Sequence, residues 1–205
     1  PPRSTLFPYT TLFRSVTSTA TYSGELDIDL VATGTYAYIN DEVVLVTAIN
    51  TTTQSLTLTR GVMDTVPVTH AAGSRIWFAD GAQGVDPTEY AAGETVNARL
   101  LTVTGKGTLA LASAPTDSLA MNRRQNRPYP PGNVKINNVA YPAVAKGDLV
   151  ISWAHRDRLS QTVILVPQTN GNIGPEASVT YTLRIYGEAG SLRRTYSGLT
   201  GASQT

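Results

Sequence analysis

Cysteine is absent from the 205 residues, and histidine occurs only as His70 and His155. The missing cysteine excludes a disulfide framework, thiol catalysis and cysteine-ligated zinc. Two histidines argue against a multi-histidine metal site. Charge is also scarce, because charged residues make up 15% of the chain and the formal net charge is +1. The chain therefore lacks the basic surface that nucleic-acid binding requires, and we expect no nucleic-acid partner.

Long apolar runs and helical periodicity are missing as well. No apolar run approaches the length of a membrane span, so we expect none. No window of a dozen residues repeats the apolar spacing of an amphipathic helix. Short segments that alternate between apolar and polar residues recur instead, separated by turns that draw on 17 glycines and 12 prolines. The sequence therefore predicts an all-β fold.

The clearest of these segments form a meander of three strands. Asn40 and Asp41, between the first two, tolerate positive φ and suit a tight hairpin turn. In the third strand, Leu56 and Leu58 share one face while threonines occupy the other. The expected strands are residues 36–39, 42–46 and 55–59, followed by 75–78, 95–104 and 108–111. Strands with such short connections are typical of a small β-barrel or meander domain.

A polar, proline-rich stretch at residues 123–133 interrupts this pattern, and its Pro130-Pro131-Gly132 sequence cannot continue a regular element. Period-two alternation returns at residues 149–153 and 181–186. The expected organisation is a small β-rich domain over 16–122, a linker over 123–133 and a second β-domain over 134–205.

The first fifteen residues resemble something other than a protein segment. The stretch TLFPYTTLFRS at residues 5–15 resembles the translated tail of a common short-read sequencing adapter, and the codons TTT-CCC-TAC-ACG-ACG-CTC-TTC-CGA-TCT encode its residues 7–15. The resemblance implies that residues 1–15 are foreign to the fold. It also implies that the chain is a fragment whose two ends need not be natural termini.

The second half resembles a fibronectin type III sandwich. The resemblance lies in a proline-and-glycine entry, the stretch LVISW at residues 149–153 and the stretch YTLRIYG at residues 181–187. It implies that Trp153 packs in the core beneath Tyr181, and that neither residue contacts a ligand. The chain departs from the family by a longer insertion at residues 154–179 and by ending where a fifth strand would begin. The expected second domain is therefore an incomplete β-sandwich.

A broader resemblance joins the two halves. The stretches LTLTRGVMDTVPVTHAAGSRIWF, RPYPPGNVKIN and GDLVISWAHRDRLSQ resemble the C-terminal half of tail-tip or central tail-hub proteins of long-tailed phages and prophages. The resemblance implies a structural virion protein that is made in the bacterial cytoplasm and located in the phage tail. Its expected partners are other tail proteins, further copies of itself and a host cell-surface receptor. An accessory region of a secreted bacterial glycan-active enzyme and a surface adhesin are the alternatives.

Two short motifs imitate enzyme signatures without their context. His155-Arg156-Asp157 matches the catalytic-loop triplet of protein kinases, but the metal-binding asparagine, the glycine-rich loop and the strand lysine are missing in register. Residues 105–110, GKGTLA, fit a loose dinucleotide fingerprint, but Pro115 leaves too little chain for the helix that must follow. A polar loop and a hairpin turn are the favoured interpretations.

Neither His70 nor the acidic residues form a recognisable site. His70 lies near Asp64 and Ser74 in sequence, which says nothing about geometry, so a loop histidine that bonds backbone groups is favoured. Some acidic residues could offer oxygens to Ca²⁺ but lack the spacing of a calcium loop. They are Asp27, Asp29, Asp41 and Glu42. We therefore expect no catalytic, cofactor-binding or metal-binding residues, no cofactor and no enzymatic activity.

Overall fold

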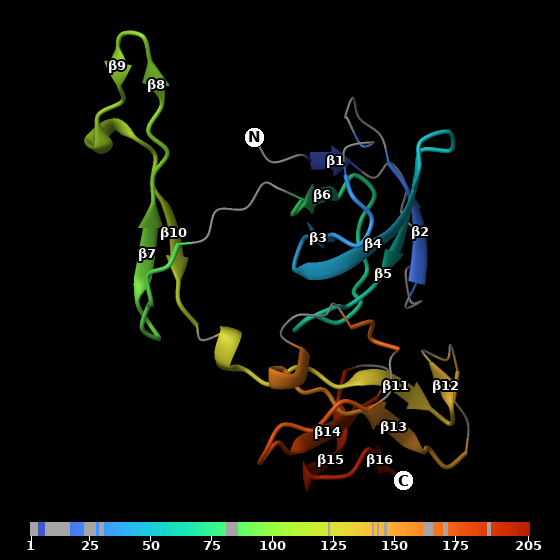
Figure 1. Cartoon of the computed structure of the whole chain (residues 1–205). Helices are drawn as coiled ribbons and strands as arrows, with labels where there is room; N and C mark the ends of the chain where they lie inside the picture. Colours follow the sequence, from blue (N-terminus) through green and yellow to red (C-terminus); the bar gives the residue numbers. More distant parts are fainter. Residues whose placement is uncertain are drawn as a thin grey trace. The chain divides into compact units, whose positions relative to one another are not determined.

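The computed structural model describes residues 4–6, 17–22, 28, 31–80, 86–122, 124–140, 142, 144–145, 147–161, 166–169, 172–187 and 190–205. Strands dominate these residues, and helix is limited to short 3-10 turns (Figure 1), which confirms the all-β prediction. The chain divides into two compact units: Pro1–Gln83 together with Pro128–Thr205, and Gly84–Arg127. A boundary therefore lies inside the segment 16–122, within a connection rich in glycine, proline and alanine.

The first unit contains a six-stranded antiparallel sheet with the order β1-β6-β3-β4-β5-β2. Its strands are β1 (Ser4–Leu6), β2 (Thr17–Thr21), β3 (Tyr36–Ile39), β4 (Glu42–Asn50), β5 (Ser55–Thr59) and β6 (Arg75–Phe78). The predicted meander is confirmed as β3, β4 and β5, with Asn40 at a φ of 51° in the first turn. Among the described residues the order runs from β1 to β2 without closing, so this part is a meander rather than a closed barrel.

Alternation along these strands builds the core. Side chains on one face of the sheet are almost completely buried, among them Ala37, Ile39, Val44, Val46, Leu56, Leu58, Ile76 and Phe78. At the start of β4 the alternation fails, because Glu42 and Val43 are buried as well as Val44. The reason is a covering loop, since the backbone N–H of Val62 donates to the oxygen of Val43 at 3.1 Å. The loop after β5 therefore lies against the start of β4, where it contacts Glu42 and Val43.

Strand β1 lies within the segment assigned to the adapter, and it pairs with β6 at the edge of the sheet. Deleting residues 1–15 is nevertheless expected to leave the thermal midpoint unchanged within error. The reason is that the pairing involves three residues and the segment is foreign to the sequence on which the core depends. Differential scanning fluorimetry of the full and shortened chains measures this. A decrease of several degrees would mean that β1 is a genuine part of the domain.

Residues 128–205 form a four-stranded sheet and a separate hairpin. The sheet has the order β12-β11-β13-β16, and the hairpin joins β14 to β15. Their bounds are β11 (Gly132–Ile136), β12 (Val139–Ala140), β13 (Ile151–Ala154), β14 (Tyr181–Tyr186), β15 (Leu192–Leu199) and β16 (Ser203–Gln204). Trp153 is only 8% exposed, and its ring centroid lies 5.5 Å from that of Tyr181, as the resemblance implied.

The apolar row of β14 is less well covered than a sandwich core requires. Tyr181, Leu183 and Ile185 share one face of the strand, but all three are only partly buried. Strand β16, which pairs with β13, occupies the place where the fifth strand was expected to begin. This part of the chain is therefore a β-structure with an incompletely filled interior.

The second unit consists of two short two-stranded ladders. Strand β7 (Thr95–Ala98) pairs with β10 (Asp117–Ala120), and β8 (Val103–Thr104) pairs with β9 (Gly107–Thr108). Figure 1 shows the second ladder continuing from the first towards a hairpin tip. The glycine-lysine-glycine sequence is the predicted hairpin turn. The predicted single strand over 95–104 is wrong because it is interrupted after Ala98, and residues 111–113 form a 3-10 turn instead of a strand end.

Candidate functional site

A cluster of buried polar groups surrounds Glu42, the first residue of β4. Glu42 is 0% exposed, Arg60 1% and His70 5%. One carboxylate oxygen of Glu42 accepts hydrogen bonds from Arg60 Nε at 2.7 Å and from the Gly61 N–H at 2.9 Å. The other oxygen accepts from Arg60 Nη2 at 2.5 Å, the Val68 N–H at 3.0 Å and His70 Nε2 at 2.8 Å. The buried carboxylate is thus fully hydrogen-bonded and paired with a buried cation.

These contacts determine the charge of Glu42. Burial alone would raise the pKa of Glu42, because it penalises the ionised form. Hydrogen bonds from His70 and Arg60, the charge of Arg60 and the Val68 N–H together outweigh burial and hold the pKa of Glu42 below its ordinary value. Glu42 is therefore an ionised structural group and offers no oxygens to a calcium ion.

His70 occupies a position defined by two side chains. Its Nδ1 atom lies 3.1 Å from Asn40 Nδ2, which can only donate a hydrogen bond. In this arrangement Nδ1 is the acceptor, and Nε2 carries the proton that is donated to Glu42. The partners of His70 are thus side chains, whereas the sequence favoured backbone groups. Neither Asp64 nor Ser74 is its hydrogen-bond partner in the described contacts, although Asn40 also reaches Ser74 Oγ at 3.5 Å.

The loop that carries His70 is held by further specific contacts. Gly61 has a φ of 59°, and a Cβ atom at this position would lie 2.5 Å from the ring of Pro67, so only glycine fits. The Thr65 hydroxyl donates to the oxygen of Val62 at 2.8 Å and accepts from the N–H of Val43 at 3.1 Å. The stretch RGVMDTVPVTH at residues 60–70 is thus a loop held against the sheet. These contacts explain the spacing of its arginine, glycine, threonine, proline and histidine.

The chemistry available at this cluster is limited. A catalytic histidine needs a nucleophile on one ring nitrogen and an orienting carboxylate on the other. His70 has the carboxylate of Glu42, but Asn40 occupies the other nitrogen. Within the described part of the chain, no hydroxyl is hydrogen-bonded to His70. The arrangement therefore stabilises a loop and lacks the geometry for covalent catalysis.

The kinase-like triplet is also used by the fold. His155 Nδ1 lies 2.9 Å from Tyr181 Oη, and the two ring centroids are 5.5 Å apart. Arg156 is buried, donates to the Pro167 carbonyl at 2.5 Å, and has its pKa lowered by burial. Asp157 accepts from the N–H of Leu159 at 2.8 Å and so caps a 3-10 turn. The three side chains diverge to separate structural roles.

An ion pair between side chains also contributes to this loop. Arg158 lies near Glu176, with 3.8 Å between Nε and Oε1, and the Arg158 N–H donates to the same carboxylate at 2.8 Å. Arg156 does not take part, because it points into the interior. A pair that is partly exposed, such as Arg158 and Glu176, contributes at most about 1 kcal/mol.

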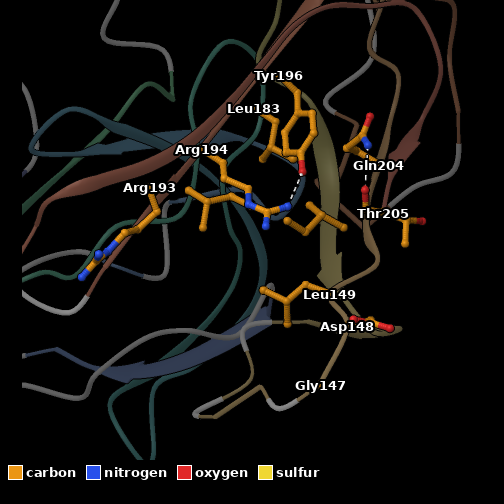
Figure 2. A pocket seen from close by; sticks show the side chains of 11 residues that line it. Gly147, Asp148, Leu149, Leu183, Arg193, Arg194, Tyr196, Gln204 and Thr205 are labelled. Carbon is orange, nitrogen blue, oxygen red and sulfur yellow. Dashed lines mark hydrogen bonds between the residues drawn. The ribbon is translucent and has the colours of Figure 1, made fainter.

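Two open cavities flank the apolar row of β14. One, of about 300 Å³, is shown in Figure 2. Its lining includes Leu149, Leu183, Tyr196, Arg193, Arg194, Gln204 and Thr205. Arg194 donates to Tyr196 Oη at 3.3 Å across its wall. The other, of about 350 Å³, is lined by residues that include Tyr129, Pro131, Trp153, Tyr181 and Leu183.

Neither cavity gathers groups for a reaction. Most of the exposed lining is apolar, and the buried Trp153 Nε1 has no hydrogen-bond partner. An unfilled gap with an unpaired indole N–H indicates incomplete packing, because interiors are normally close-packed and their polar groups bonded. The cavities are therefore openings in the interior of this β-structure.

Comparisons with known proteins add no family. No protein-family model matches the chain, and no curated protein matches it. Within the described ranges, no helix is long and apolar enough to cross a membrane. The same residues contain no group of three or more acidic, histidine or cysteine side chains placed to hold a metal ion. Asp27 and Asp29, which the sequence considered for calcium, lie outside the described residues.

Proposed function

We propose that this chain is a structural, non-enzymatic component of the tail tip of a long-tailed phage or prophage, contributing to tail assembly and host adsorption. The observation that carries the proposal is the cluster around Glu42. One of the three stretches that resemble tail-tip proteins places Arg60, Gly61 and His70 in one buried network that fixes a loop. Because the polar residues of this cluster bond to one another and hold a loop, they suit a structural protein better than an enzyme.

Exposed apolar side chains support a role in assembly. In the second unit Leu100 is 86% exposed, Val103 72% and Leu119 64%. These three side chains belong to one short segment, and contiguous exposed apolar surface commonly marks a protein interface. Its expected partners are other tail proteins and further copies of the chain.

The alternative of a glycan-binding accessory region finds less support. Sugar recognition by stacking needs an aromatic ring with an open face, and Trp153 is only 8% exposed. The ring of Tyr181 is in contact with both Trp153 and His155. The cluster is therefore better suited to packing than to a sugar.

Replacing His155 and Asp157 by alanine is expected to leave any activity of the parent protein unchanged. The reason is that His155 contacts Tyr181, and Asp157 caps a 3-10 turn by accepting from the Leu159 N–H and the Ser160 hydroxyl. The check is turnover of the parent protein together with circular dichroism of each variant. Complete loss of turnover with an intact fold would contradict a structural role for this loop.

Deletion of the parent gene tests the proposal itself. The expected result is particles that lack a functional tail tip and fail to adsorb, restored by the gene in trans. Genes for the tape measure and tail assembly are expected beside it. Fully infectious particles from the deletion strain would contradict the proposal. Loss of a secreted glycan-degrading activity would favour the alternative, an accessory region of a glycan-active enzyme.

A further inference from the structure

The ladder of β7 and β10 carries one large apolar cross-strand pair, on a face that also holds Ala98 and Asp117. Val96 lies opposite Leu119 on one face, and Leu119 is 64% exposed. Asn97 lies opposite Ser118 on the other face, where the Ser118 hydroxyl is 2.6 Å from Asn97 Oδ1. We call residues 93–121 the arm.

The arm has almost no interior of its own. Ala114 is the only buried side chain among the described residues 86–122. An isolated two-stranded ladder is marginally stable in water, and three or more strands with a covered apolar face are needed for independent stability. Pairing with strands of a partner would therefore stabilise the arm.

Within the described residues, no strand pairs with β7 on the side away from β10, and this open edge is suited to receive a strand. The N–H of Met121 donates to the oxygen of Glu94 at 2.8 Å, and its own oxygen accepts from the N–H of Gly93 at 2.8 Å. Because backbone groups of antiparallel strands alternate in direction, Val96 points towards β10, while Thr95 and Asn97 point to the open edge. Strand β7, TVNA, contains no charge, proline or bulge of the kind that normally blocks edge pairing.

We propose that β7 pairs antiparallel with β7 of a second copy of this chain, around a two-fold axis at Val96. In this register Thr95 of each copy lies opposite Asn97 of the other. The N–H and C=O groups of these residues, which point to the open edge, can then form hydrogen bonds between the two copies. Glu94 lies opposite Ala98, and no like charges face each other. The result is one four-stranded sheet across two copies, with Leu119, Val96, Val96 and Leu119 in a row on one face, which also carries Asp117 of each copy.

A second copy fits this edge because the strand is complementary to itself. An isologous interface uses the same patch on both partners, and the two central valines then form the closely spaced cross-strand pair. The assembly also reaches the number of strands that an independent sheet needs. The inference stands on the geometry of the arm and does not depend on the proposed function.

Two proline substitutions at directly opposed positions test which edge is used. Thr95→Pro removes the N–H on the open edge of β7, and Ala120→Pro removes the matching N–H on the outer edge of β10. Neither substitution removes a bond between β7 and β10. Light scattering after size exclusion, over a concentration series, should show dimers for the unmodified chain and for Ala120→Pro. Thr95→Pro should weaken association by roughly tenfold or more.

Single cysteines in this cysteine-free chain test the register. Val96→Cys would place two thiols on residues whose Cα atoms are about 4.5 Å apart, within the range of a disulfide. Leu119→Cys, its neighbour on the same face, would place them three strand spacings, about 14 Å, apart. Mild oxidation should therefore cross-link the first variant and leave the second largely uncross-linked.

Three results would each overturn the inference. They are an unmodified chain that stays monomeric at all concentrations, a dimer that Thr95→Pro does not weaken, and Leu119→Cys cross-linking as fast as Val96→Cys. The first would leave another protein as the partner of the arm, and the others would place the interface elsewhere. Circular dichroism of each variant distinguishes loss of pairing from loss of fold.

Discussion

Replacing Glu42 by glutamine will lower the free energy of unfolding of the first sheet by about 3–5 kcal/mol, because it leaves a buried charge without its partner. Arg60 is 1% exposed and has its guanidinium against the Glu42 carboxylate. The neutral amide of glutamine has no negative charge to pair with Arg60. Only one of its two terminal atoms is an oxygen that accepts hydrogen bonds, whereas both carboxylate oxygens of Glu42 do so. The cluster should therefore lose both the ion pair and part of the bonding that holds the loop.

Urea denaturation measures this loss, and Asp41→Asn is the matched control. Asp41 is adjacent in sequence but exposed, so its charge can be removed at little cost. The six-stranded sheet contains Trp77, in β6, and the region of residues 128–205 contains Trp153, in β13. In variants that retain only Trp77, tryptophan fluorescence therefore reports on the six-stranded sheet. A change below 1 kcal/mol for Glu42→Gln would show that the cluster does not hold the loop.

The same substitution has a defined dependence on pH. The pKa of Glu42 is lowered from its model-compound value of 4.5, so the stability it contributes is fully present above that value. It is lost as the pH falls through the lower pKa of the folded state. The difference in stability between the unmodified chain and Glu42→Gln should thus be constant near neutrality and shrink below about pH 4.5. A difference that grows on acidification would contradict the assignment of an ionised carboxylate.

Replacing Trp153 by alanine is expected to unfold the region of residues 128–205. Truncation of a buried tryptophan typically costs about 3–5 kcal/mol. Trp153 packs against Tyr181, and the cavities along β14 show that this interior has little surplus packing to lose. The six-stranded sheet around Val43 and Leu56 should remain folded, because its core is separate.

Proteolysis and the remaining fluorescence of Trp77 distinguish these regions. Trypsin should cleave the variant rapidly after Arg158 and Arg184 while the first sheet resists. Trp153→Phe is the control, since it keeps an aromatic ring beside Tyr181 and should retain most of the stability. A variant Trp153→Ala that resists protease and denaturant like the unmodified chain would mean that Trp153 is not the centre of this interior.

The elements that the sequence predicted well are those determined locally. The meander of β3 to β5 follows from alternation and from the turn at Asn40, which need no distant partner. The pairing of Trp153 with Tyr181 followed from a resemblance. By contrast, alternation did not predict that the strand ends after Ala98. Alternation describes a single segment and does not show which other strands are present to pair with it.

The cluster around Glu42 was missed because its members are far apart in sequence. Glu42 and His70 are separated by 28 residues and meet only once the loop folds over β4. One local signal was available, namely an acidic residue opening the apolar run 43–46, where alternation is absent and both faces must be covered. An acidic residue in such a place needs a buried cation, and Arg60 at the end of the next strand is positioned to supply it.

The central claim is that this chain belongs to the tail tip of a virion. The most direct measurement is immunogold electron microscopy of purified particles of the parent phage, with antibodies raised against residues 31–80. The account predicts gold at the end of the tail distal to the capsid, absent from particles of the deletion strain. Particles without label, together with antigen in the culture medium or on the bacterial surface, would contradict it.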